Sequence, residues 1–491
     1  MSENKHKKAQ EEKHSNVKYA IVGVLSVVLV AFLLVWNTGI IQRNAAAVTV
    51  DGEKYSAADV QYYLRSLMLQ NGISSTSSLK SMTMNSTTGE TMYDYLKSQA
   101  VERLVTCAAL DKQAGEEGFA MSDDTQTQVD DQLKQLEEQW VSAGYQSRDA
   151  FIRANYGPYM TYDRLVELFT RDMRVSEYST QFSDSLSYSD TDYEKYYQEN
   201  ANTLDEYTLT QFVFNATVDT VDADGNAIEM TDDEKAAALE QAKTEKQAQA
   251  QELQAKLEAG EDPAQLAQEY ADQLTGDPSV SQVMSGSSVA SASYAQWAQD
   301  TARQKGDVTL SEYDAGPSSY YYFEGRARND ENPATVRHIL VAAEQDEGAS
   351  EPTEDQYAAA KTKAEELLEQ WKSGPATQES FAELAKANSA DTGSAADGGL
   401  ITDIYSGSGY VSTFTDWALD AARRPGDTGI VQNTGSSVKG WHIMYFVGRD
   451  GDPVWKLTAK TAMENNDYTT WQNAAKDKVS YTTGLGLKFV Q

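Results

Sequence analysis

Cysteine and histidine are both scarce in this chain of 491 residues. The single cysteine, Cys107, excludes an intrachain disulfide, and it lies too far along the chain to accept a lipid beside the apolar N-terminal segment. Its helical surroundings predict a small buried residue. Two of the four histidines lie within the first fourteen residues, so only His338 and His442 remain for the body of the protein.

Basic residues are also in deficit, because 41 Lys and Arg face 75 Asp and Glu, for a net charge of −34. A partner nucleic acid is excluded on this ground, since phosphate binding needs a basic face. The charge is uneven: residues 1–18 hold five lysines against three glutamates, ahead of a strongly acidic body. The length predicts about three domains of ~100–200 residues each.

An apolar run without a charged residue covers residues 19–36 and extends to residue 41. Eighteen helical residues span about 27 Å, close to the hydrocarbon core of a bilayer. Tyr19 and Trp36 stand where interfacial aromatics belong, and the lysines before them favour a cytoplasmic N-terminus. We therefore predict a single-pass anchor in the cell membrane, with an extracytoplasmic body.

A cleaved signal peptide is the alternative, because the small residues Ala45, Ala46 and Ala47 follow the apolar run. The run is longer than the core of ordinary signal peptides, and residues 42–44 separate it from the alanines, so we favour the uncleaved anchor. Under either interpretation the body is exported.

Residues 46–204 begin with a strand, an Asp51-Gly52 turn and a helix with Ser56 as its N-cap. Amphipathic helices dominate the rest, and their many aromatic residues suit either an ordinary core or a groove for unfolded chains. The predicted helices are Gln61–Met68, Tyr93–Gly115, Thr127–Ala143, Ser147–Asn155, Met160–Tyr178 and Asp192–Glu199.

An internal repeat follows, at a spacing of about 120 residues. Trp297–Asp307 and Trp417–Asp427 are identical at seven of eleven positions, and each reads as a short helix that ends in a glycine turn. Two copies of one α+β domain therefore stand in tandem. The supporting pairs are Tyr322–Arg326 with Tyr445–Arg449, and the long helices Thr231–Ala259 with Glu354–Ser373.

His338 and His442 both lie in apolar strand-like runs of the second copy. Strand alternation places each ring on one face, so the rings meet if the strands are neighbours. A lone histidine in such a run is usually a core residue, but the first copy has Gln211 and Ser319 at the two positions. Because one copy keeps the scaffold without the imidazoles, the comparison favours a function confined to the second copy.

The second copy resembles the parvulin-type peptidyl-prolyl cis/trans isomerases. The resemblance covers about 120 residues: Arg337–Val341, Phe381–Leu400 with Asp391 and the Gly398-Gly399 pair, Phe414–Ala421, and Gly440–Ile443. The layout as a whole is similar to the exported parvulin foldases of the SurA and PrsA kind. The first copy lacks equivalents of both histidines and of the glycine pair, which indicates a degenerate, inactive domain.

The resemblance implies an α+β multidomain fold with a SurA-like helical chaperone domain, two tandem parvulin-like domains and one N-terminal transmembrane helix. The expected boundaries are residues 1–18 for the cytoplasmic tail, 19–41 for the anchor, 46–204 for the helical domain, 205–330 for the degenerate parvulin-like domain, 331–449 for the isomerase domain, and 450–491 for a C-terminal helix and strand that pack back on the helical domain.

For the site, the resemblance implies His338, Asp391 and His442 as the catalytic residues, without metal or cofactor. Leu340, Tyr410 and Phe414 are implied as the apolar slot for the proline ring. Tyr410 departs from the more usual aliphatic type, and Lys439 stands where a small hydroxyl residue is frequent. The acidic loop 342–347 excludes selectivity for phosphoserine-proline.

The expected function is a membrane-anchored foldase that isomerises X–Pro bonds in unfolded or nascent exported polypeptides and also acts as a chaperone. The alternative is a non-catalytic chaperone that uses its parvulin domains as binding platforms. The sequence indicates neither the client proteins nor an oligomeric state.

Overall fold

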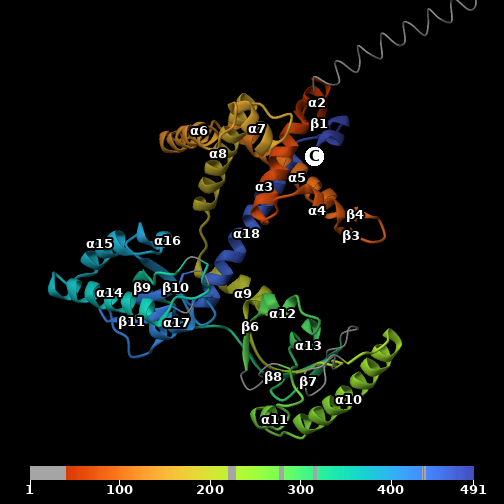
Figure 1. Ribbon diagram of the computed structural model, residues 1–491, viewed down its shortest axis with the longest axis vertical. Coiled ribbons are helices and arrows are strands. Elements are labelled where there is room, and N and C mark those ends of the chain that lie inside the picture. Colours follow the sequence, from red (N-terminus) through yellow and green to blue (C-terminus); the bar gives the residue numbers. More distant parts are fainter. Residues whose placement is uncertain are drawn as a thin grey trace, which may run out of the picture. The chain divides into compact units, whose positions relative to one another are not determined.

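The computed structural model describes residues 40–218, 228–275, 281–312, 318–346, 348–433, 435, 438–449 and 451–491 (Figure 1). The chain divides into two compact units. The helical unit joins Met1–Ser187 to Glu464–Gln491, and the α+β unit is Tyr188–Met463.

The helical unit is closed by a small sheet in which the C-terminal segment pairs with the first described strand. The sheet order is β13-β1-β2, with β1 at Ala46–Val50, β2 at Glu53–Ser56 and β13 at Tyr481–Thr483. Asp51 and Gly52 turn β1 into β2 with φ of 46° and 88°, which suits the predicted Asp-Gly turn. The hydroxyl of Tyr93 donates to the carbonyl of Val490 at 2.8 Å, so the C-terminus is bound into this core.

Helices form most of the rest of this unit. Five of the six predicted helices are present here, with ends shifted by up to seven residues, and the sixth, Asp192–Glu199, lies within α9 (Asp190–Leu204) of the other unit. Ser56 is the N-cap of α3 as predicted, and its backbone N–H donates to Asp59 at 2.5 Å. The elements are α2 (Ile40–Asn44), α3 (Ala57–Gln70), α4 (Thr76–Ser81), β3 (Thr83–Asn85), β4 (Glu90–Thr91), α5 (Met92–Glu116), α6 (Asp123–Ser142), α7 (Arg148–Tyr156), α8 (Tyr162–Ser185) and η1 (Leu485–Phe489). Helix α18 (Val454–Asp477) spans the boundary between the units.

Cys107 is buried on α5, which confirms its predicted burial. Its Sγ donates to Asp172 Oδ1 at 3.1 Å. Burial, and then the Asp172 carboxylate, raise the pKa of Cys107 to about 12. The thiol therefore stays protonated and unreactive at neutral pH.

The α+β unit contains two antiparallel sheets of the same strand order, β6-β5-β8-β7 and β10-β9-β12-β11. The first sheet group contains β5 (Glu206–Phe214), α10 (Asp232–Glu258), α11 (Pro263–Glu269), β6 (Gln282–Ser285), α12 (Gly286–Ala290), α13 (Ala295–Ala298), β7 (Val308–Glu312) and β8 (Ser318–Ala327), preceded by α9 (Asp190–Leu204). The second contains β9 (Ala334–Ala342), α14 (Glu354–Ser373), α15 (Gln378–Asn388), α16 (Thr392–Ala395), β10 (Leu400–Ile404), α17 (Ser412–Leu419), β11 (Thr428–Asn433) and β12 (Gly440–Gly448).

The repeated sequence motif makes the same turn in both sheet groups. After the helix that carries the motif's tryptophan, Gly306 and Gly426 adopt φ of 100° and 95°. Their N–H groups donate to the carbonyls of Phe323 and Phe446 at 3.0 and 2.9 Å. The identical residues of the repeat thus maintain one turn that returns the chain to the sheet.

The predicted membrane anchor, residues 19–41, lies almost entirely outside the described residues. Of the helices that are described, none combines the length and the apolar character that a membrane crossing requires.

Candidate active site

His338 and His442 lie on adjacent antiparallel strands, β9 and β12. His338 pairs with Met444, and His442 pairs with Leu340, so both rings project from one face of the sheet. The two Nδ1 atoms are 3.0 Å apart. The residues are only 4% and 7% exposed, so water does not compete strongly for this contact.

Asp391 joins the pair from the loop between α15 and α16. Its Oδ2 lies 2.8 Å from His338 Nε2, and its Oδ1 accepts from the backbone of Gly393 at the start of α16. The carboxylate therefore caps a short helix and contacts an imidazole at once. The structure brings His338, Asp391 and His442 together in one hydrogen-bonded chain.

Ser394 is a member of this network that sequence reasoning did not assign. Its hydroxyl donates to Asp391 Oδ2 at 2.5 Å and lies 3.0 Å from His338 Nε2, and the residue is 5% exposed. The signal in the sequence is its spacing, since a residue three positions after a helix-capping aspartate lies within reach of that carboxylate.

The loop that carries Asp391 is tied to β9 at both of its ends. Ala390 N donates to Leu340 O at 2.8 Å, and His338 N donates to Gly399 O at 2.8 Å. Gly399 has φ of +70°, and a Cβ there would lie 2.0 Å from the carbonyl oxygen of His338. Only glycine allows this close approach, which positions Asp391 against the histidine.

Both imidazoles are neutral at physiological pH. Burial lowers the pKa of His338, despite the opposing effect of Asp391. Burial, and then the neighbouring His338, lower the pKa of His442 to about 3. Partial burial tends to raise the pKa of Asp391, but hydrogen bonds from Ser394 and His338 outweigh it and lower that pKa. The carboxylate is therefore anionic.

This anion determines which nitrogens of the two rings carry protons. A carboxylate only accepts, so His338 must carry its proton on Nε2 to donate to Asp391. Its Nδ1 is then an acceptor, and His442 must donate from Nδ1 across the 3.0 Å contact. His442 Nε2 is consequently left without a proton and can only accept.

The predicted apolar residues lie beside this polar network. Phe414, 2% exposed, packs edge-on against His338 and His442 with ring centroids 5.5 and 5.1 Å apart. Tyr410 lies 5.4 Å from Phe414 and is 43% exposed, while Leu340 is buried opposite His442. The Lys439 side chain forms an ion pair with Glu351 at 2.9 Å.

The strand register of the first copy assigns the equivalent positions independently of the sequence alignment. In β8 and β12 the strand register shifts directly after Phe323 and Phe446, so these two residues correspond. Their partners Leu209 and Val336 correspond as well, and counting along the strands places Gln211 at the position of His338 and Ser319 at that of His442. The positions that match the glycine pair fall among residues 276–280, outside the described residues.

Two tyrosines pack together in the first copy where the second has Phe414 and Met444. Tyr294 corresponds to Phe414, because each lies three residues before the tryptophan of the repeated motif. The centroid of the Tyr294 ring lies 3.9 Å from that of Tyr321, and both residues are buried. Among the described residues of the whole chain, no group of three or more His, Cys, Asp or Glu side chains is placed to hold a metal ion.

Comparison with protein families matches two parts of the chain. Residues 338–448 match the PPIC-type PPIase domain, and this stretch contains all six predicted site residues and Ser394. The second copy is a PPIC-type peptidyl-prolyl isomerase domain. Residues 9–178 match the SurA-like N-terminal domain, and this stretch falls within the N-terminal part of the helical unit.

Solved structures with partial likeness come from PrsA proteins. PrsA from Bacillus anthracis, a peptidylprolyl isomerase, is 19% identical to this chain, with a TM-score of 0.20. The match covers 30% of this chain and 59% of the PrsA chain, so this protein spans less than two thirds of that relative's length. PrsA from Bacillus subtilis is 14% identical, over 82% of this chain and 87% of the PrsA chain, with a TM-score of 0.26. The foldase PrsA from Streptococcus pneumoniae is 13% identical, over 83% of this chain and 92% of its own chain, also with a TM-score of 0.26. No curated protein matches the sequence.

Proposed function

We propose that the chain is a membrane-anchored extracytoplasmic foldase that isomerises X–Pro bonds in unfolded exported polypeptides and also binds such chains as a chaperone. The observation that carries the proposal is the buried His338–His442 pair, connected to Asp391 and packed against Phe414, within a PPIC-type domain. In this proposal residues 205–330 are a degenerate copy of the domain at 331–449, and residues 46–204 are the chaperone domain.

The reaction needs a particular environment rather than a reactive group. Rotation about an X–Pro bond faces about 18–20 kcal/mol and breaks no covalent bond. At the twisted amide the lost resonance leaves charge more localised, so fixed dipoles in a dry site stabilise it more than the planar form. The neutral imidazoles of His338 and His442 supply such dipoles, since Asp391 holds their tautomers.

The apolar part of the site supports the same proposal. Phe414 and Tyr410 form an aromatic surface that extends from the buried imidazoles to a partly exposed ring. A proline ring has no N–H to satisfy and gains from contact with such a surface. Asp391 has no role as a nucleophile here, because its carboxylate is occupied by His338, Ser394 and Gly393.

The catalytic proposal is tested with the full-length protein, by following cis/trans exchange of a proline tetrapeptide. We expect His442→Ala to lower kcat/KM about tenfold, because a buried hydrogen bond of this kind contributes roughly 1–2 kcal/mol. Gln211→Ala, at the position that corresponds to His338 in the first copy, is the matched control and leaves the rate unchanged. Equal rates for wild type and His442→Ala would overturn the proposal.

A non-catalytic chaperone is the second candidate, favoured by the first copy, which keeps the sheet order without either imidazole. The two functions separate in one comparison. Under the catalytic proposal, His442→Ala slows refolding of a client limited by proline isomerisation while it still suppresses aggregation. If both activities are unchanged, the platform function is the correct one.

The location is proposed from the uncharged run at residues 19–36 and the lysines before it. We expect the protein to stay in the membrane fraction after alkaline carbonate extraction, and external protease to digest the body. An intact N-terminus in mass analysis of the membrane-bound protein separates the anchor from a cleaved signal peptide.

A further inference from the structure

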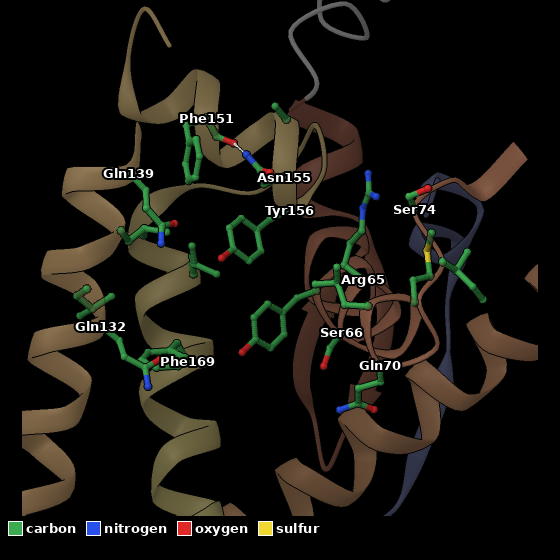
Figure 2. A pocket seen from close by; sticks show the side chains of 18 residues that line it. Arg65, Ser66, Gln70, Ser74, Gln132, Gln139, Phe151, Asn155, Tyr156 and Phe169 are labelled. Atoms are coloured by element: carbon green, nitrogen blue, oxygen red, sulfur yellow. Dashed lines mark hydrogen bonds between the residues drawn. The ribbon is translucent and has the colours of Figure 1, made fainter. Parts of the chain in front are cut away.

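The helical unit contains a cleft between α3 on one side and α6, α7 and α8 on the other (Figure 2). Its volume is about 640 Å³, within the range of about 300–1,000 Å³ that is usual for ligand pockets. Aromatic rings from three helices line it: Tyr62, Phe151, Tyr156 and Phe169. Leu69 adds an exposed aliphatic surface, with 76% of it accessible.

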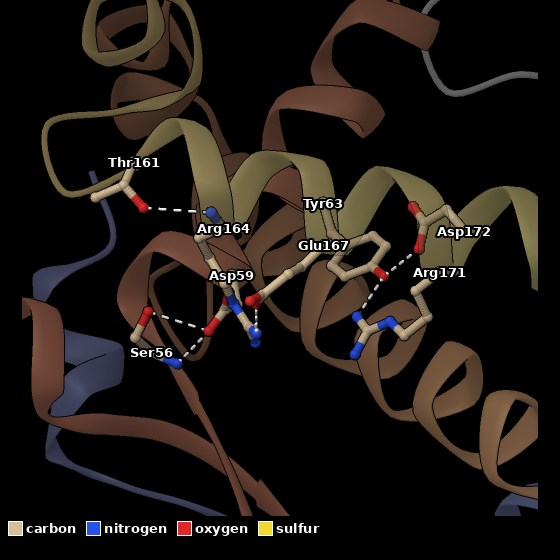
Figure 3. Close-up of polar contacts among 8 residues, drawn as sticks. All are labelled: Ser56, Asp59, Tyr63, Thr161, Arg164, Glu167, Arg171 and Asp172. Carbon is tan, nitrogen blue, oxygen red and sulfur yellow. Dashed lines mark hydrogen bonds and ion pairs between the residues drawn. The ribbon is translucent and has the colours of Figure 1, made fainter. Parts of the chain in front are cut away.

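Partly buried polar contacts between α3 and α8 join the two sides of the cleft (Figure 3). Asp59, whose side chain is 2% exposed, pairs with Arg164 at 2.6 Å. The hydroxyl of Tyr63 donates to Asp172 at 2.6 Å and accepts from Arg171 at 2.9 Å. These contacts link two helices that are far apart in the sequence, so α3 and α8 stay together.

Helix α6, which lies on the same side of the cleft as α8, has fewer buried contacts. Helix α6 has twenty residues, of which only Val129 is buried. Its partly buried Leu136 and Trp140 pack against the cluster formed with α7 and α8. Few apolar contacts therefore hold α6 in place, together with the 2.8 Å ion pair between Glu137 and Arg148 of α7.

The charge of the lining is unusual for this protein. Charged residues make up 24% of the chain, so about four would be expected among the 18 described residues that line the cleft. Arg65 is the one charged residue among them. Its Nε atom is buried and has no hydrogen-bond partner among the described residues. Five other arginines of the unit donate to side-chain oxygens: Arg103, Arg148, Arg164, Arg171 and Arg174. Of these, only Arg171 also has a buried Nε without a partner among the described residues.

We propose that this cleft is a second peptide-binding site, which takes an extended segment of an unfolded polypeptide with large apolar side chains and one Asp or Glu side chain. The rings and leucines receive the apolar groups, and Arg65 pairs with the carboxylate that the cleft itself lacks. The site deepens the chaperone part of the proposed function and does not depend on proline.

The amide side chains of the lining explain how one cleft serves many sequences. Gln132 and Gln139 each offer both a donor and an acceptor. Gln70 offers its amide N–H groups, since its Oε1 accepts from Arg103, and Asn155 offers its amide oxygen, since its Nδ2 donates to the carbonyl of Phe151. These groups match the N–H and C=O of an extended backbone, which are the same in every polypeptide. Selectivity then comes from the apolar side chains and from the charge at Arg65.

The test measures binding of a fluorescent capped peptide that carries leucine and phenylalanine around one glutamate and contains no proline. Full-length protein in lipid nanodiscs is titrated, with empty nanodiscs as the blank. We expect Arg65→Gln to weaken binding about fivefold, the worth of a partly exposed ion pair. Arg153→Gln removes the same charge from an exposed position of α7 outside the lining and serves as the control.

A charge swap makes the test specific. Arg65→Glu should reject the glutamate peptide and bind the same peptide with lysine in its place. Leu69→Ser should weaken both peptides by a similar factor without lowering the melting temperature, since Leu69 is exposed. The proposal is overturned if Arg65→Gln binds the glutamate peptide as tightly as Arg153→Gln does, or if Arg65→Glu fails to bind the lysine peptide.

Failure of this proposal is distinguishable from failure of the isomerase proposal. Arg65→Gln should retain the wild-type rate of tetrapeptide isomerisation, and His442→Ala should retain wild-type affinity for the peptide without proline. A loss of both properties in either variant would show that the two sites are not independent and would overturn the assignment of a separate cleft.

Discussion

Acidification should loosen the second sheet and spare the first, because only the second buries histidines. The pKa of His442 falls from 6.5 to about 3 on folding, and burial also lowers that of His338. Between pH 6.5 and 3 the unfolded strand therefore binds protons that the folded strand does not. The stabilisation is complete above pH 6.5 and is lost progressively as the pH falls through this window.

The size of the effect follows from the shift. Each pH unit below 6.5 costs about 1.4 kcal/mol for each such group, so at pH 5 His442 alone lowers the free energy of opening by about 2 kcal/mol. His442 is only 7% exposed, so solvent screening reduces this value little. His338 acts in the same direction.

Hydrogen exchange of the full-length protein, corrected for intrinsic rates, measures this opening free energy at pH 7 and pH 5. We expect β9 and β12 to lose protection between the two conditions, and His442→Gln to abolish about 2 kcal/mol of that loss. Strands β5 and β8 of the first copy form the equivalent sheet, in which Gln211 and Ser319 stand at the positions of the two histidines. They provide the control within the chain. Equal losses in both sheets, or an unchanged loss in His442→Gln, would refute the reasoning.

Three further predictions follow from single contacts. Gly399→Ala should destabilise the PPIC-type domain by at least 3 kcal/mol in denaturant unfolding, because its Cβ would lie 2.0 Å from a carbonyl oxygen. Gly407→Ala is the control: Gly407 has a φ of +93° but open space around a Cβ, so its substitution should cost only about 1 kcal/mol. Ser394→Ala should lower kcat several-fold with KM unchanged and Ser394→Thr should restore part of it, since the hydroxyl orients Asp391 without touching the peptide. Tyr63→Phe should lower the melting temperature of the helical unit, as a buried hydrogen bond to a carboxylate contributes about 1.5–3 kcal/mol.

Local periodicity and capping residues were sufficient to predict most helices. Ser56 caps α3, and the predicted helix Glu354–Ser373 coincides with α14. The repeat predicted the pairing of Gln211 with the position of His338, because the identical turn residues align both sheets. These features depend on residues close together in sequence, where the pattern of apolar and polar side chains determines the structure.

Contacts between distant segments could not be predicted in the same way. The C-terminal segment 450–491 was expected to form a helix and a strand, and both are present, but the strand covers only Tyr481–Thr483 and is followed by a 3₁₀ helix at Leu485–Phe489 that packs near β1. Pairing of β13 with β1 brings together residues more than 400 positions apart, and nothing in either segment alone specifies the other. Burial of Cys107 was predictable, whereas its contact with Asp172 was not.

By itself, the sequence determined that two histidines stand in strands of one repeat copy, that the other copy lacks them, and that the whole resembles a parvulin foldase. Only the tertiary structure decided that the two Nδ1 atoms meet at 3.0 Å, that Ser394 contacts Asp391, and that Arg65 is the one charged residue among the described residues that line the cleft. The physical reason is that strand period assigns a side chain to a face, while strand register, loop anchoring and helix packing decide which side chains share that face.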